Sequence, residues 1–145
     1  MPEHLSFEVN TFYNSIDNYI YLEPWDSVMD DVPVYAYTQS AASLYGGEAG
    51  VHFHPHSVHW LHLESNFSTV IAEDKYGNAL PLIPANTLAT KARVELEKKG
   101  KWGFTEIYMQ HIYTFRQDRP ALFETASADY TLINTGFAME FGEGG

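Results

Sequence analysis

Apolar and polar residues alternate along much of this 145-residue chain, which is the pattern of β-strands. Residues 7–12 read Phe-Glu-Val-Asn-Thr-Phe, and residues 91–96 alternate in the same way. β-Branched and aromatic residues predict further strands at 19–22, 32–37, 51–63, 68–72, 80–83, 105–115, 130–133 and 137–141. Turn signals separate these strands at a spacing of roughly 8–12 residues, which favours a β-sandwich or β-barrel.

Turns and helices are less strongly marked than strands. Residues 73–78, Glu-Asp-Lys-Tyr-Gly-Asn, predict a hairpin turn, and Lys-Lys-Gly-Lys at 98–101 predicts a second one. Residues 85–98 contain helix formers and could instead be a helix from Asn86, while 26–31 could form one helical turn. We predict one domain, with N-terminal strands in 1–40, a central core in 46–90 and C-terminal strands in 91–145.

Composition and charge exclude several classes of protein. Hydrophobic residues make up 45% of the chain and aromatic residues 15%, which is too many for a disordered chain. The net charge of −11 disfavours nucleic acid and anionic membranes as partners. The absence of cysteine excludes disulfides and thiolate metal sites. With no signal-peptide pattern and no apolar run of about 18 residues, we expect a cytoplasmic or virion protein without a membrane partner.

Histidines are concentrated in one short stretch. Five of the seven lie at positions 52, 54, 56, 59 and 62. His52 and His54 should share one face of a strand, with Cα atoms about 6.6 Å apart. Pro55 should break that strand, so that His59 begins a second, antiparallel strand and folds back beside His54. His62 should then face away, and His56 should lie in the turn.

This arrangement predicts an open metal site. His52, His54 and His59 could hold a divalent transition metal, with Fe, Zn, Ni, Mn and Cu as candidates, because histidine is the commonest metal ligand in proteins. The alternative is that these are solvated strand histidines, or core histidines hydrogen-bonded to tyrosine and carbonyl groups. Glu64 and Tyr108 are candidate catalytic groups that would move protons beside the metal.

The stretch 46–90 resembles the cupin superfamily. Gly46 is followed by five residues and by His52-Phe-His54, as in the first cupin motif, with His59 where the family usually has Glu. Residues 77–87 are similar to the second motif, but Ala89 stands where its histidine would fall, and His111 could replace that ligand. The resemblance implies a jelly roll, that is a double-stranded β-helix barrel, with the metal site in the barrel mouth.

Three functional hypotheses follow from these patterns. The first is a cupin-like, metal-dependent enzyme of the oxygenase, isomerase or lyase type that acts on a small-molecule substrate. The second is a structural assembly protein, such as a virion decoration or tail-associated jelly roll. The third is a non-catalytic, ligand-binding cupin that would use Trp25, Trp60 and Trp102. Exposed sheet edges also favour a homo-oligomer.

Overall fold

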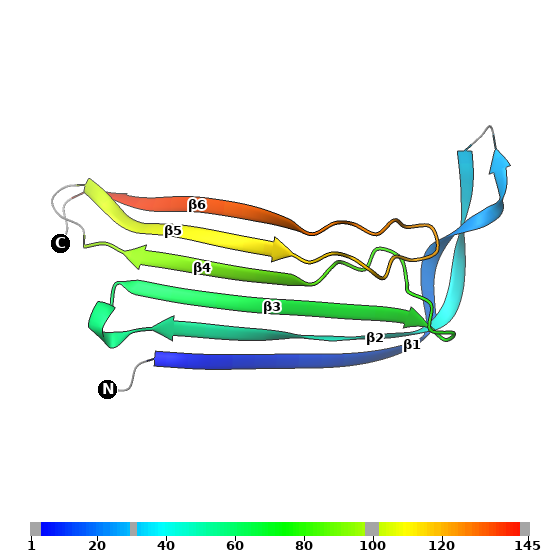
Figure 1. The fold of residues 1–145 in the computed structure, drawn as a ribbon, viewed down its shortest axis with the longest axis horizontal. Helices are drawn as coiled ribbons and strands as arrows, with labels where there is room; N and C mark the ends of the chain where they lie inside the picture. The colour runs from blue at the N-terminus through cyan, green and yellow to red at the C-terminus, as the bar shows by residue number, and fades with distance from the viewer. Residues whose placement is uncertain (1–3, 30–31, 98–101, 143–145) are drawn as a thin grey trace.

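The chain is a single antiparallel sheet of six strands in the order of the sequence (Figure 1). The structure, a computed structural model, describes residues 4–29, 32–97 and 102–142. The strands are β1 (His4–Met29), β2 (Val32–His54), β3 (Leu61–Asp74), β4 (Thr87–Glu95), β5 (Trp102–Thr114) and β6 (Tyr130–Phe141). A short 3-10 turn, η1 (His56–Val58), follows Pro55. Each strand pairs with the next, so β1 and β6 form the two edges.

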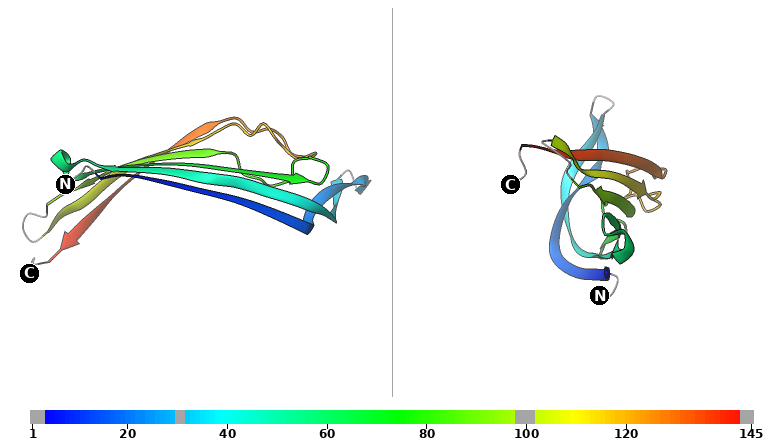
Figure 2. Two further views of the ribbon diagram at one scale, coloured as in Figure 1. Left: turned by 90° about the horizontal axis from the view of Figure 1, so that it is seen from below. Right: turned by 90° about the vertical axis from the view of Figure 1, so that its left-hand side faces the viewer.

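The all-β prediction is confirmed, but the jelly roll is not. The six strands form one curved layer that is not closed (Figure 2), whereas a double-stranded β-helix barrel requires a closed arrangement of two sheets. The alternative helix at 85–98 is wrong, since Thr87–Glu95 is strand β4. The predicted strand at 80–83 is also wrong, because these residues belong to the β3–β4 connection. The second predicted turn at 98–101 lies outside the described residues.

The register of the strands places apolar side chains on one face of the sheet. Directly paired residues share a face, and alternate residues along each strand do so as well. This apolar face comprises residues 5, 7, 9, 11 and 13 of β1, 45, 47, 49, 51 and 53 of β2, 61, 63, 65, 67, 69 and 71 of β3, 88, 90, 92 and 94 of β4, 107, 109, 111 and 113 of β5, and 131, 133, 135 and 137 of β6. None of these positions is Asp, Glu, Lys or Arg.

The opposite, polar face carries the intervening residues. It includes Glu8 and Asn10, Glu48 and His52, His62, Glu64 and Asn66, Lys91 and Arg93, Glu106 and Gln110, and Asn134. The alternation of the sequence is therefore a separation of chemistry between the two sides of one sheet, rather than the two inner faces of a sandwich.

The two ends of the sheet differ in their connections. At one end, η1 joins β2 to β3 across residues 55–60. At the other end lie the longer connections 75–86 and 115–129, together with the far part of the β1–β2 hairpin, which projects beyond the sheet (Figure 1). Irregularities between Ile16 and Tyr19 and between Pro24 and Val28 interrupt the β1–β2 register in that projection. We call these the short-turn end and the long-loop end.

The buried core of the described residues is small and lies at the long-loop end. Ala42, Ala72 and Leu80 form it, with partly buried side chains of Tyr19, Tyr21, Leu44 and Ile83 packed around them. Leu80 comes from the β3–β4 connection, which folds over the polar side of the sheet to reach the two alanines. The described residues contain no helix long and apolar enough to cross a membrane.

Candidate functional site

Three histidines gather on the polar face near the short-turn end. The ring centroids of His54 and His62 are 4.1 Å apart, and those of His52 and His62 are 5.7 Å apart with nearly parallel planes. The prediction that His52 and His54 share a face is confirmed, and so is the antiparallel return after Pro55. His62 does not face away, because the register pairs His52 with Glu64 and therefore puts His62 on the same side.

Burial leaves part of this histidine cluster without hydrogen bonds. His62 is 8% exposed, and its Nδ1 is buried without a hydrogen-bond partner. Its Nε2 lies 3.2 Å from Glu95 Oε1, within ion-pair distance. His52 Nε2 is also buried without a partner. A buried ring nitrogen without a hydrogen bond costs free energy.

The other predicted metal ligands lie elsewhere. His59 is in the turn, where its main-chain carbonyl, not its ring, contacts His54 Nε2 at 2.7 Å. His111 pairs with Thr90 on the apolar face, on the opposite side of the sheet from His52. Within the described parts of the chain, no three histidine or carboxylate groups are placed to hold one metal ion. Metal binding by these residues stays a prediction.

The two predicted proton-transfer residues both lie on the polar face. Glu64 faces His52 across β2 and β3, and both line a shallow hollow of about 410 Å³ with Glu8 and Asn66. Tyr108 lies farther across the sheet, with Lys91 Nζ 4.6 Å from its ring centroid. Lys91, which is paired with Glu64 across β3 and β4, lies between these two residues on the described part of the polar face.

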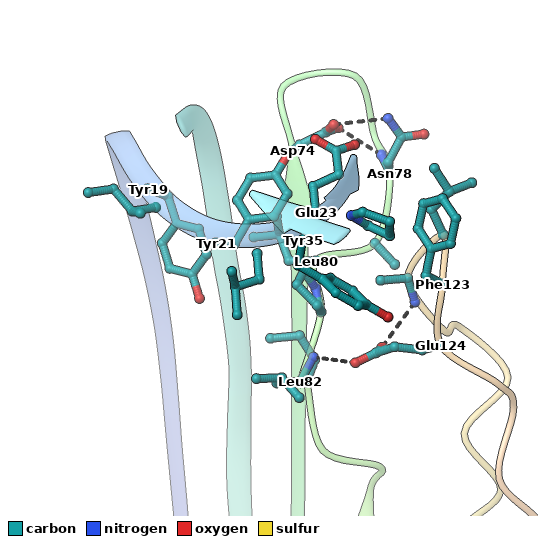
Figure 3. Close-up of a pocket in the computed structure, with 18 residues that line it drawn as sticks. Tyr19, Tyr21, Glu23, Tyr35, Asp74, Asn78, Leu80, Leu82, Phe123 and Glu124 are labelled. Carbon is teal, nitrogen blue, oxygen red and sulfur yellow. Dashed lines mark hydrogen bonds between the residues drawn. The ribbon is translucent and has the colours of Figure 1, made fainter. Parts of the chain in front are cut away.

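A larger cavity of about 720 Å³ lies at the long-loop end (Figure 3). Three segments far apart in the sequence line it: the projecting part of β1 with Tyr35 of β2, the β3–β4 connection, and the β5–β6 connection. Its wall is mostly apolar and aromatic, with Tyr19, Tyr21, Leu80 and Phe123 among the lining side chains. Cavities of this size and character are typical of small-molecule sites.

Two of the three carboxylates in the cavity wall hold the connections in shape. Asp74 accepts hydrogen bonds from the main-chain amides of Tyr76 and Asn78, at 2.8 and 2.9 Å. Glu124 accepts from the main-chain amides of Leu82 and Ala121, at 2.7 and 3.1 Å (Figure 3). These bonds fix loop geometry and leave the third carboxylate, Glu23, as the one with no such role among the described contacts.

The electrostatic character of the cavity is negative. Burial raises the pKa of Tyr21, and the nearby charges of Glu23 and Asp74 raise it further. Among the described residues that line the cavity there is no Lys, Arg or His. Tyr21 is therefore protonated at neutral pH and can donate a hydrogen bond into the cavity.

An ion-pair clamp ties the β5–β6 connection to the sheet. Arg119 forms a short ion pair with Glu73 at the end of β3, and Tyr45 donates a hydrogen bond to the same carboxylate at 3.2 Å. Gln117 Nε2 donates to the carbonyl of Ile83 at 2.9 Å, which links the two long connections. The pairing with Glu73 raises the pKa of Arg119 above its ordinary value. The clamp holds in place the connection that carries Phe123.

Sequence reasoning missed this cavity. It is built from residues that the strand pattern assigns to separate elements, and the lining residues of β1 follow a register shift between Ile16 and Tyr19. A usable signal was present in residues 80–83, Leu-Pro-Leu-Ile, because an apolar run with a central proline inside a connection needs something to pack against.

The fold of this chain resembles part of a known protein structure. No family model and no curated protein matches the chain, so the cupin resemblance stays a prediction. Among solved structures, a chain named "Copper transporter OprC" superposes with a TM-score of 0.73 at 15% sequence identity. The match covers 89% of this chain and 20% of that one, so the chain spans about a fifth of the length of the transporter. At this identity the likeness concerns the fold alone.

This likeness overturns three expectations. The expectation of a cytoplasmic, cupin-like enzyme acting on a small molecule is contradicted, because the fold is instead one found in a protein named as a copper transporter. The expected absence of a membrane partner is contradicted by the same likeness of fold. The alternatives of a virion or tail-associated jelly roll and of a ligand-binding cupin are also wrong, as they depended on the same architecture. The described residues of this chain share their fold with part of a chain named as a copper transporter.

Proposed function

We propose that this chain forms part of the wall of a membrane-spanning transporter. In this proposal the apolar face contacts the acyl chains of the lipid, and the polar face lines a water-filled or protein-filled interior. The separation of the two faces is the observation that carries the proposal. A sheet that crosses a bilayer alternates lipid-facing and interior-facing residues in this way.

The exposure of the apolar face supports contact with lipid. Phe7 is 70% exposed, and Ile133 and Phe137 are each 66% exposed. Soluble proteins rarely leave contiguous apolar surface of such extent uncovered. Hydroxyl groups on this face bond to one another, as Ser65 Oγ and Thr90 Oγ1 do at 3.1 Å. Such pairing removes the cost of placing them in an apolar medium.

The dimensions of the strands fit a bilayer. A tilted strand crosses the hydrocarbon core with about 9–11 residues, and stretches 5–13, 45–53 and 61–71 have that length. Aromatic side chains gather at the long-loop end of the apolar face, where the rings of Tyr13 and Tyr45 stack and those of Tyr113 and Phe115 meet edge to face at 4.8 Å. Aromatic girdles of this kind mark the membrane–water interfaces.

The two edges of the sheet support a wall that continues beyond these six strands. The outer edges of β1 and β6 have no strand partner among the described residues. Unpaired main-chain groups cannot face hydrocarbon, so a sheet in the membrane must close on itself. Further strands would therefore join at both edges, which agrees with a match to about a fifth of a longer transporter chain.

We propose a transition metal as the cargo that passes along the polar face. Imidazole nitrogens suit copper, zinc, nickel and iron, and His52 and His54 both lie on the polar face. Two imidazoles make a weak, exchangeable site, as passage requires. Titration of Cu²⁺ into the chain should show binding that a His52→Ala/His54→Ala variant loses. A His111→Ala variant, altered on the opposite face, should retain it, and equal loss in both variants would contradict the assignment.

The absence of cysteine allows a direct test of the wall proposal. Single cysteines would be placed at three neighbouring pairs, Phe7 and Glu8, Met109 and Gln110, and Ile133 and Asn134, and then labelled with nitroxides in lipid vesicles. Each pair puts one label on the apolar face and one on the polar face at almost the same depth. The first label of each pair should collide mainly with dissolved oxygen, and the second mainly with a water-soluble nickel complex.

The pattern of the six labels decides the outcome. Alternation of accessibility in all three pairs supports an apolar face in contact with lipid. Equal access of the nickel complex to both members of each pair would place both faces in water and refute the proposal. Circular dichroism of each labelled variant shows whether its sheet has formed.

A further inference from the structure

We propose that the cavity at the long-loop end binds a small organic cation with an aromatic or otherwise flat apolar body. This goes beyond transport as such, and it does not depend on the contact with lipid, because the cavity lies past the aromatic end of the apolar face.

The shape and composition of the cavity indicate a small-molecule ligand. Its volume of about 720 Å³ falls within the range of roughly 300–1,000 Å³ for such sites. Leu80 and Ile83 form an apolar floor, and Leu80 is buried to 2% exposure against Ala42 and Ala72. The floor is therefore a fixed part of the fold, and the ligand would not have to create it.

Charge selects a cation. The lining carries Glu23, Asp74 and Glu124 and no basic side chain. Asp74 and Glu124 are already engaged by main-chain amides, while Glu23 has no hydrogen bond among the described contacts. Glu23 lies in the upper part of the cavity close to Asp74 in Figure 3, and both carboxylates act on Tyr21. A ligand cation would supply the positive charge that this group of acids lacks.

Aromatic rings would hold the body of the ligand. The rings of Tyr19 and Tyr21 are stacked with centroids 6.2 Å apart. Tyr35 and Phe123 are more than half exposed although they line the cavity, so their faces are available to a ligand. Aromatic faces attract cations through the negative potential above the ring, and they also stack on flat molecules.

The experiment compares three probes of similar size. Benzyltrimethylammonium is the cation, benzyl alcohol the neutral probe and benzoate the anion, each titrated calorimetrically into the full chain in a non-ionic detergent. The cation should bind at least about tenfold more tightly than the other two, since cation–π and charge contacts together exceed one factor of ten. Equal binding of all three probes, or binding of none, overturns the proposal.

Two matched variants locate the site. Glu23→Gln should weaken binding of the cation by about tenfold, because it removes the charge and keeps the shape. Glu8→Gln makes the same change on the same strand but away from the cavity, and it should change the affinity less than twofold. A Phe123→Ala variant should weaken binding of the cation as well. Unchanged affinity in Glu23→Gln would refute the role of this carboxylate, and the nitroxide measurements would be unaffected by that result.

Discussion

Tyr108 and Gly136 face each other across β5 and β6, and the tyrosine ring occupies the space that a side chain at position 136 would need. A Cβ at Gly136 would overlap the far part of the ring, including the hydroxyl. The Lys91 ammonium also lies over this ring, 4.6 Å from its centroid. Glycine at 136 therefore lets an aromatic side chain lie flat along the polar face and cover the neighbouring strand.

Replacing this glycine tests the relationship. Gly136→Ala should lower the free energy of unfolding by about 1–3 kcal/mol, because the ring must leave its place. The same change in a Tyr108→Ala background should cost much less, since the obstruction is gone. Urea unfolding followed by tryptophan fluorescence in lipid vesicles measures both. Equal losses in the two backgrounds would mean that the ring is not the obstacle.

A side chain at position 46 would meet a more rigid obstacle than one at position 136. A Cβ at position 46 would overlap the main-chain carbonyl of Thr69 and lie 3.0 Å from the Cα of Val70, and neither atom can swing aside. Gly46→Ala should therefore cost about 3 kcal/mol or prevent folding. Gly77→Ala is the control, because Gly77 has open space around it and a φ of 85°, so the strain should cost about 1 kcal/mol. Equal costs for the two changes would contradict this order.

Adjacent residues on β5 should respond oppositely to charge. Met109→Arg places a cation on the apolar face and should cost about 2–4 kcal/mol if that position lies near the middle of the bilayer. Gln110→Arg puts the same side chain on the polar face and should cost less than about 1 kcal/mol. Unfolding in vesicles compares them. Where the apolar face is in contact with water instead of lipid, the difference between the two costs should shrink. A difference that persists there would argue against lipid as its cause.

The Arg119–Glu73 clamp should control the mobility of the long connections. Arg119→Ala should accelerate amide hydrogen exchange in residues 117–127, because the ion pair and its anchor on β3 are lost. Exchange in β4 and β5 should remain as in the original chain, which provides the internal control. Arg116→Ala removes an exposed ion pair with Asp118 and should have little effect. Equal acceleration by both variants would contradict a specific clamp.

The turn after β3 should weaken in acid. Burial opposes ionisation of Asp74, but hydrogen bonds from Asn78, Tyr76 and Gly77 outweigh it and lower the pKa of Asp74 below 3.8. The folded turn therefore binds this proton less readily than the unfolded chain does. Its stabilisation is present above about pH 4 and is lost as the pH falls through the lowered pKa.

Amide chemical shifts of Tyr76 and Asn78 would report this titration. We expect one step below pH 3.8 in the original chain and none in an Asp74→Asn variant. A step at or above pH 3.8 would contradict the lowered pKa, and a step that persists in the variant would belong to another group.

The sequence allowed the strands and one turn to be predicted because their causes are local. Alternation marked parts of β1 and β4, aromatic and β-branched residues marked β5, Pro55 marked the end of β2, and the Asp74–Asn78 segment formed the expected turn. The position of His62 depended on a different kind of information. Residues 56–58 form a 3-10 turn, so the return strand begins at Leu61 and its register cannot be counted from His59.

The likeness to a transporter could not be predicted from the sequence for a related reason. A search for about 18 consecutive apolar residues finds helices that cross membranes, but an alternating strand shows only every second residue to lipid. When the hydropathies of neighbours such as Phe7 and Glu8 are averaged, the strand resembles one from a soluble protein. The exposure of large side chains on the apolar face, such as Phe7 and Ile133, appears only when the strands are assembled and no other described residues cover them. The cavity likewise required the loops to be placed in space.

The small core at Ala42, Ala72 and Leu80 has a consequence for how this chain can reach its final form. Collapse in water would gain little free energy, because most large apolar side chains would stay wet. The main hydrophobic gain comes when acyl chains replace that water, so insertion and folding should be one coupled event. Its rate and yield should then depend on bilayer thickness, with an optimum near a hydrocarbon core of about 30 Å.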